Sequence, residues 1–223
     1  MKKTLSSIIL TVLAVALVIG MGAAVASAQD NIQQIDVFTT NYFSNNTTPG
    51  APAATLRFTQ QQSEVPGINP ALDYEETCAM IYVYAADQQL AECCGCPVSL
   101  NGLVHENVQK DLLGNTLTRV VPNEGVIQIV SGLYESVGTI GYCDPTDVVP
   151  VPEINSWVTH VQNKVGTAFP ITESRGDEEL LTDGELATLE ADCSFAMRLG
   201  SGFGVCTCNS DGSKVPPPPP PVS

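Results

Sequence analysis

The chain has 223 residues and carries 24 acidic side chains against nine lysines and arginines, which gives a net charge of −15. Nucleic acids and anionic membrane surfaces are poor partners for it, because both attract clustered Lys and Arg, and from Arg57 onward the cations are scattered singly. The excess of carboxylates favours solubility, with a surface for a cation or a cationic partner as the alternative. The length fits one domain with appendages, or two small domains.

The first 28 residues have the pattern of an export signal. Two early lysines precede an uncharged apolar run over residues 8–19, and Ala26-Ser27-Ala28 supplies the small-x-small pattern of a signal peptidase site. We expect cleavage between Ala28 and Gln29, which leaves 195 residues with a net charge of −17 because both lysines are removed. The apolar run is shorter than the roughly 20 residues of a membrane span, so we expect none in the mature chain. The pattern indicates a bacterial protein that is secreted or periplasmic.

All eight cysteines follow this signal. An exported chain enters an oxidising compartment, so the cysteines indicate a disulfide framework. Eight cysteines allow 105 pairings, and the sequence does not choose among them. The cysteines are Cys78, Cys93, Cys94, Cys96, Cys143, Cys193, Cys206 and Cys208.

Some local constraints on the pairing follow from strand geometry. Cys93 and Cys94 cannot easily bridge each other, because adjacent side chains on a strand point to opposite faces. A hairpin that turns near Ala86-Asp87 would bring Cys78 roughly opposite residues 94–96. Farther along the chain, Cys193 could reach Cys206 or Cys208.

The segment from Cys93 to Cys96 has two other interpretations. With Cys206 and Cys208 it could supply thiolates to a metal, but zinc motifs usually space their pairs as C-x₂₋₄-C, unlike the CC and C-x-C spacings here. Cys93 and Cys96 also stand at the C-x-x-C spacing of redox proteins, but Cys94 interrupts that motif. These patterns leave thiol or metal handling as an alternative function.

The pattern in the first half of the mature chain predicts short strands separated by turns. Residues 35–38 and 56–58 are β-prone and are separated by a polar stretch over residues 45–50. Residues 78–84 are apolar on both faces, which predicts a central buried strand. The chain then returns through residues 90–96, so the two segments predict a hairpin.

A second hairpin is predicted after residue 116. Residues 117–121 and 126–130 have strand composition and flank Pro122-Asn123-Glu124-Gly125. Proline is favoured early in a turn and glycine accepts positive φ, so this tetrapeptide is typical of a hairpin connection.

Past Cys143 the pattern changes to that of helices. Ile154, Trp157, Val158 and Val161 recur at helical spacing and predict a short amphipathic helix. A second helix is expected between a capping box and a terminal glycine. Thr182 and Glu185 form the box, Gly200 ends the helix, and one face carries Leu186, Leu189, Cys193 and Met197.

These elements predict a mainly β protein with a helical C-terminal part. We expect an immunoglobulin-like β-sandwich core within residues 29–142, because several short strands must bury one face against a second sheet. A segment of two short helices over residues 143–208 would be tied to this core by disulfides, and residues 209–223 form a proline-rich tail. The alternative is an α+β fold in which the helices cover one face of a single sheet.

Catalytic signals are weak. The chain has only two histidines, His105 and His160, and no serine lies in a G-x-S-x-G motif. With 24 carboxylates, some pair will meet in any fold, so an extracytoplasmic hydrolase that uses carboxylates stays open. The pattern assigns no catalytic residue and no cofactor-binding residue.

Calcium has two weak candidates. Residues 209–212 resemble the start of an EF-hand loop, but the glutamate that should complete the loop is absent. Asp144 and Asp147 flank a turn and could form a site with Glu135. Short acidic turns are common without an ion, so neither pattern assigns a metal site.

The chain resembles a group of secreted, cysteine-rich bacterial proteins of unknown function. The segments that carry the resemblance are residues 78–83 (CAMIYV), 92–97 (ECCGCP), 193–195 (CSF) and 204–208 (GVCTC). The resemblance covers most of the mature chain. It implies a shared cysteine framework and brings no activity, cofactor or catalytic residue.

Together these patterns favour an exported, disulfide-stabilised, non-enzymatic module. Its role would be adhesion, surface structure or the binding of a protein or glycan ligand. Buried carboxylates gathered in one cleft would favour a hydrolase instead, whereas a flat aromatic or apolar exposed patch would favour a binding module.

Overall fold

The computed structural model describes residues 37–60, 76–137, 140–152 and 154–208. All of them belong to one compact unit. The expected signal segment and the proline-rich tail lie outside the described residues. No helix in the described part has both the length and the apolarity that a membrane crossing requires.

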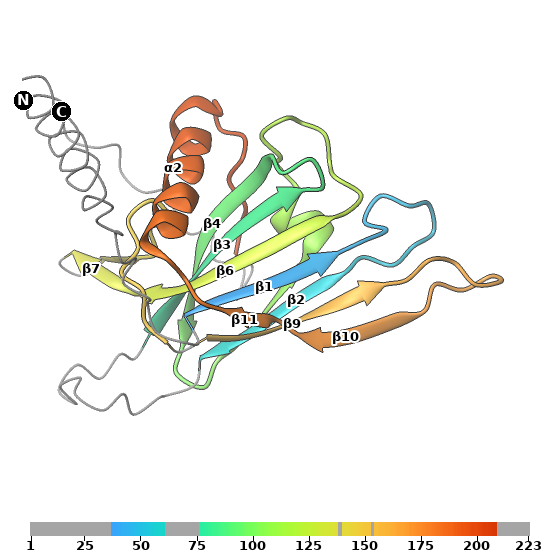
Figure 1. Ribbon diagram of the computed structural model, residues 1–223, viewed down its shortest axis with the longest axis horizontal. Coiled ribbons are helices and arrows are strands. Elements are labelled where there is room, and N and C mark those ends of the chain that lie inside the picture. The colour runs from blue at the N-terminus through green and yellow to red at the C-terminus, as the bar shows by residue number, and fades with distance from the viewer. Residues whose placement is uncertain (1–36, 61–75, 138–139, 153, 209–223) are drawn as a thin grey trace, which may run out of the picture. The chain divides into compact units, whose positions relative to one another are not determined.

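The described strands form two main antiparallel sheets that face each other (Figure 1). The larger sheet has the order β11-β1-β6-β3-β4, and the smaller has the order β10-β9-β2-β5. Strands β7 and β8 form a separate two-stranded sheet. The elements are β1 (Phe38–Phe43), β2 (Thr55–Gln60), β3 (Glu76–Ala85), β4 (Leu90–Ser99), β5 (Leu103–Asn107), the π-helix η1 (Val108–Leu112), β6 (Gly125–Leu133), β7 (Glu135–Val137), β8 (Ile140–Tyr142), β9 (Ile154–Val161), β10 (Ile171–Arg175), β11 (Asp177–Glu179) and the helix α2 (Asp183–Leu199).

Strand β3 is an internal strand of the larger sheet. It pairs with β4 on one edge and with β6 on the other, and residues 77–83 are buried. Ala79 and Ile81 point into the core between the sheets, whereas Met80 and Tyr82 point to the opposite face, beneath α2. The predicted buried strand and its hairpin with β4 are therefore confirmed. The β-sandwich and the C-terminal helix are confirmed as well.

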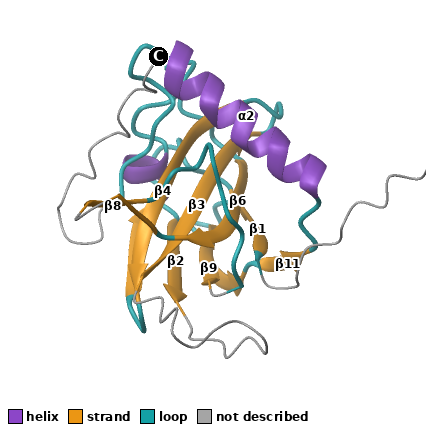
Figure 2. Cartoon of the chain, turned by 90° about the vertical axis from the view of Figure 1, so that its left-hand side faces the viewer, coloured by secondary structure: helices purple, strands orange, loops and turns teal. Residues whose placement is uncertain are grey.

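Helix α2 lies over the outer face of the larger sheet (Figure 2). The Oγ1 atom of Thr182 accepts a hydrogen bond of 3.2 Å from the N–H of Glu185, and the N–H of Gly200 donates to the carbonyl of Ala196 at 2.8 Å. Leu189 and Cys193 are buried against the sheet. Both predicted ends of this helix and its buried face are thus confirmed.

The helix predicted over residues 154–161 is wrong, because this segment is strand β9. It pairs with β2 on one edge and β10 on the other. Its burial alternates, with Ile154 and Val158 facing the core and Trp157 facing outward. A buried polar residue, Ser156, occupies the inward position between the two apolar ones and concealed the two-residue period. Its hydroxyl meets that of Thr39 at 3.0 Å.

The second predicted hairpin is also wrong. Residues 117–121 form no strand, although β6 follows them as expected. Both edges of β6 are occupied, by β1 and by β3, so the preceding segment has no edge left to pair with. Of the two early predicted strands, residues 56–58 lie in β2. For the strand predicted over residues 35–38, residues 35 and 36 lie outside the described residues, and Phe38 is the first residue of β1.

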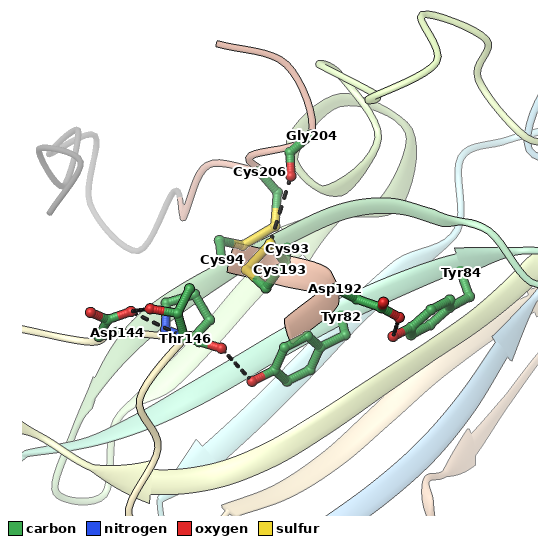
Figure 3. Close-up of a disulfide and its surroundings, with 11 residues drawn as sticks. Tyr82, Tyr84, Cys93, Cys94, Asp144, Thr146, Asp192, Cys193, Gly204 and Cys206 are labelled. Atoms are coloured by element: carbon green, nitrogen blue, oxygen red, sulfur yellow. Dashed lines mark hydrogen bonds between the residues drawn. A yellow bond between two sulfur atoms is a disulfide. The ribbon is translucent and has the colours of Figure 1, made fainter. Parts of the chain in front are cut away.

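The eight cysteines, all within the described residues, form four disulfides. Cys93 and Cys94 point to opposite faces of β4, as expected, and reach different partners (Figure 3). The bridges are Cys78–Cys143, Cys93–Cys193, Cys94–Cys206 and Cys96–Cys208.

The two pairings suggested by the sequence are wrong. Cys78 pairs in register with Pro97, but its side chain lies on the helix side of the sheet, whereas Cys94 and Cys96 point into the sandwich. Cys193 reaches Cys93 because α2 crosses that same outer face.

The segment after α2 runs parallel to the outer edge of β4. The N–H of Cys93 donates to the carbonyl of Gly204 at 3.0 Å, and the N–H of Cys206 donates to the carbonyl of Cys93 at 3.1 Å. The bridges Cys94–Cys206 and Cys96–Cys208 both join residues 112 positions apart, so the two C-x-C segments are in register. This segment covers an edge that would otherwise be open to pairing with another chain.

The chain passes from the smaller sheet to the larger one at Gly176, between β10 and β11. Its N–H donates to the carbonyl of Ser156 at 2.9 Å. A Cβ atom at this position would lie 2.6 Å from the Ser156 hydroxyl oxygen and 2.8 Å from Nδ2 of Asn41. The crossing therefore requires glycine because of a close approach between strands.

We predict that Gly176→Ala lowers the free energy of unfolding by about 1–3 kcal/mol, because the methyl group must displace a buried polar pair. Denaturant unfolding of the oxidised protein measures the change. Gly184→Ala in the first turn of α2 is the matched control, since no atom lies within 4 Å of its Cβ position. Equal stability of the two variants would contradict the close packing at the crossing.

We also predict that the bridge Cys96–Cys208 contributes less to stability than the bridge Cys78–Cys143. When Cys94–Cys206 is closed, Cys96–Cys208 closes only a small additional ring, so replacing that pair by alanine should cost less than replacing Cys78 and Cys143. The latter pair has a sequence separation of 65, and closing such a loop is worth about 4 kcal/mol in the chain-entropy model. Unfolding by guanidinium chloride under non-reducing conditions compares the two variants. A larger loss for Cys96 and Cys208 would contradict this account.

Candidate ligand-binding site

The cysteine cluster is a buried part of the framework. The sulfur atoms of Cys94, Cys96 and Cys208 lie within 4.8 Å of one another, close enough to surround a metal ion. Each of the three belongs to a disulfide, and thiolates rather than disulfide sulfurs are the usual metal ligands. In the oxidised protein the cluster therefore joins β4 to the C-terminal segment.

The two histidines occupy different environments and do not come together. His105 is exposed on β5. His160 is buried on β9, stacks on the ring of Tyr42 with 4.0 Å between centroids, and its Nε2 lies 2.6 Å from the hydroxyl of Ser174. Burial lowers the pKa of His160, with an opposing effect from the Tyr42 backbone. His160 thus connects β1, β9 and β10 at one side of the sandwich.

The calcium candidates do not form a site in the described residues. Asp144 accepts hydrogen bonds from the N–H and the hydroxyl of Thr146, at 2.9 and 2.7 Å, as a turn-forming aspartate does (Figure 3). Asp147 is exposed. The side chain of Glu135 and residues 209–212 lie outside what the structure describes.

One carboxylate that the sequence did not single out is fully buried. Glu92, on β4 between the two sheets, accepts a hydrogen bond of 2.6 Å on Oε1 from the N–H of Asn115, while Oε2 has no partner among the described residues. Burial raises the pKa of Glu92 from 4.5 to about 8, against a smaller opposite effect of the Asn115 hydrogen bond. Glu92 is therefore largely protonated at neutral pH, as buried carboxyl groups often are.

The two sheets differ in what covers their outer faces. Helix α2 covers the larger sheet, whereas no described helix or strand packs on the outer face of the β10-β9-β2-β5 sheet. The outward residues of β2 and β9 alternate with buried ones and are partly exposed. All residues of β10 are exposed. We call this surface the open face.

A cross-strand row of side chains crosses the open face. His105 of β5 pairs with Arg57 of β2, Arg57 with Trp157 of β9, and Trp157 with Arg175 of β10. Trp157 is the only tryptophan in the chain. Its strand neighbours are two guanidinium groups, so the aromatic ring lies between planar hydrogen-bond donors.

Neighbouring carboxylates and amides hold these two arginines in place. Arg57 Nη1 lies 2.9 Å from Oε1 of Glu173, an ion pair that spans β9 from β2 to β10. Arg175 contacts the carboxylate of Glu178 and the side-chain oxygen of Asn155. The side chains of Arg57 and Arg175 remain 43% and 52% exposed. The row is therefore ordered by its own contacts and still accessible.

A second row next to it consists of hydroxyl groups. The hydroxyl of Thr159 on β9 accepts a hydrogen bond of 2.7 Å from the backbone N–H of Thr55 on β2 and lies 3.1 Å from its hydroxyl. The open face thus combines one indole ring, two guanidinium groups and threonine hydroxyls on a rigid sheet.

Helical periodicity does not reveal the open face, because it places Trp157 in a predicted helix. The available signal was the alternation of Asn155, Trp157 and Thr159 with Ile154 and Val158. The sequence gives no such signal for Glu92. It follows Leu90-Ala91 and precedes Cys93-Cys94, so polar and apolar residues do not alternate around it.

Comparisons with protein-family models, with curated proteins and with solved structures find no match to this chain.

We predict that Glu92 makes the folded state less stable as pH rises from about 4.5 to 8. Within that range the folded protein holds a proton that the unfolded chain releases, so unfolding becomes easier with increasing pH. Glu92→Gln keeps an acceptor for the Asn115 N–H and removes the titration. At pH 8.5 this variant should exceed the parent by on the order of 2–3 kcal/mol, and at pH 4 the two should be similar. Denaturant unfolding at both pH values measures this, and parallel pH profiles would contradict the buried, protonated carboxyl.

Proposed function

We propose that this protein is an exported, non-enzymatic module that binds a glycan through the open face. The observation that carries the proposal is the row Arg57, Trp157 and Arg175 on the one broad sheet surface that no described element covers. The signal pattern and the disulfide framework support secretion or a periplasmic location, where such a stabilised module would meet extracellular sugars.

The chemistry of the open face favours a sugar over an apolar protein surface. The C–H face of a pyranose packs on an indole ring, while its hydroxyls need fixed donors and acceptors nearby. Arg57 and Arg175 supply donors, and the carboxylate of Glu173 and the amide of Asn155 supply acceptors. Because these groups are already held by one another, little side-chain entropy is lost on binding.

We predict that Trp157→Ala weakens binding to soluble oligosaccharides by at least about tenfold, equivalent to 1.4 kcal/mol. Isothermal titration calorimetry against cellohexaose, chitohexaose and oligogalacturonate measures the change for the mature, oxidised chain. Trp157→Phe, which keeps an aromatic ring, should restore part of the affinity.

Phe195→Ala is the matched control, because Phe195 is an exposed aromatic residue on α2, which covers the other sheet. It should leave the affinity unchanged. If none of the three oligosaccharides binds, the open face is not the glycan site. The same conclusion follows if Trp157→Ala and Phe195→Ala lose affinity equally. Binding of a protein to the open face would then favour a protein ligand over a glycan ligand.

A further inference from the structure

The outward face of α2 is unusually poor in charge for a helix of an acidic protein. Ala187, Ala191 and Phe195 follow one another at four-residue spacing and are all exposed, and Leu199 continues the series at the end of the helix. Phe195 and Leu199 are 57% and 67% exposed. The exposed charged residues of α2 are Asp183 in its first turn and Arg198 in its last, so the exposed residues between them carry no charge. A soluble monomer normally places charged side chains on such a face.

The acidic residues in the middle of α2 are directed toward the sheet. Oε1 of Glu190 accepts a hydrogen bond of 2.8 Å from the N–H of Val148. Oδ2 of Asp192 accepts one of 2.9 Å from the hydroxyl of Tyr84, as Figure 3 shows. These contacts orient the two carboxylates away from the outward ridge, which leaves it free of negative charge in its centre.

We call the ridge formed by Ala187, Ala191, Phe195 and Leu199 the helix patch. Two further exposed apolar residues belong to segments that adjoin the helix. Leu180 precedes α2 and is 49% exposed, and Val149, also 49% exposed, follows Val148, whose N–H is hydrogen-bonded to Glu190 of the helix.

The order of residues along α2 matches a second copy of itself. The helix runs from Asp183 to Leu199, so Ala191 is its central residue. In an antiparallel pair with the two-fold axis at Ala191, Phe195 of one copy lies over Ala187 of the other. A large side chain then meets a small one twice, as ridges-into-grooves packing requires.

The charges at the helix ends agree with this arrangement. Asp183 lies in the first turn and Arg198 in the last. Antiparallel pairing brings each arginine next to the acidic first turn of the other copy and also aligns the helix dipoles favourably. A parallel arrangement would place like charges together at both ends.

We propose that the protein forms a symmetric homodimer through the helix patch, with two α2 helices packed antiparallel about Ala191. The patch is one helix wide, so its area is at the low end for specific interfaces and the dimer is weak and reversible. The high negative net charge of the whole chain opposes association, so added salt strengthens the dimer. The open face lies on the other sheet, so a dimer would present two open faces to a multivalent ligand.

Sedimentation equilibrium of the mature, oxidised chain from about 10 μM to 1 mM tests the proposal. The weight-average mass should rise toward twice the monomer mass and rise further when NaCl is increased from 50 to 300 mM. Ala191→Glu places two like charges at the two-fold axis and keeps a good helix former, so it should raise the dissociation constant at least tenfold. Phe195→Gln should act in the same direction.

Val165→Glu is the control, because Val165 is a 69% exposed apolar residue outside α2. It should leave the dissociation constant unchanged, and far-UV circular dichroism should show that all variants are folded. A chain that stays monomeric throughout, or a dimer that Ala191→Glu does not weaken, would overturn the proposal. A dimer weakened by Val165→Glu instead would place the interface on another surface.

Discussion

The fold depends on the disulfides that leave strand β4. Three of the four bridges start there, one to α2 and two to the segment that follows it, while the fourth fastens the neighbouring strand β3. Because Cys93 faces outward and Cys94 and Cys96 face inward, β4 is bound to the helix layer on one side and to the sandwich core on the other. The chain closes loops of 100 and 112 residues in this way, which removes much of the freedom of the unfolded state.

This arrangement gives the two sheets different roles. The larger sheet carries both the disulfides and α2, so its outer face belongs to the core of the protein. The described strands of the smaller sheet contain no cysteine, and this sheet is held to the larger one through the shared core, the hydroxyl contact of Ser156 with Thr39 and the stacking of His160 on Tyr42. Its outer face is then available for a ligand, and the side chains of Arg57 and Trp157 are placed there by strand pairing rather than by a loop. Under the proposed function, such a platform would need little reorganisation on binding.

Sequence periodicity predicted the elements whose environment is uniform and failed where buried polar residues interrupt it. The strand at Cys78 is apolar on both faces and α2 has a complete capping box, so both were recognised. The pattern of β9 predicts a helix because two of its inward residues, Ser156 and His160, are polar, and their partners Thr39 and Ser174 lie on other strands. The pairing of Cys193 with Cys93, and the open face around Trp157, depend on the same long-range packing. Such contacts leave no local signal in the sequence.

The most direct test of this account is the disulfide map of the oxidised, unreduced protein by proteolysis and mass spectrometry. The four predicted links are Cys78–Cys143, Cys93–Cys193, Cys94–Cys206 and Cys96–Cys208. Because Cys93 and Cys94 are adjacent, fragmentation must separate them to assign their partners. A map in which Cys93 joins Cys206, or in which any of the eight is a free thiol, would contradict the division of β4 between helix and core. Finding all four links would support the two-sided anchoring of β4 on which the covered face and the open face both depend.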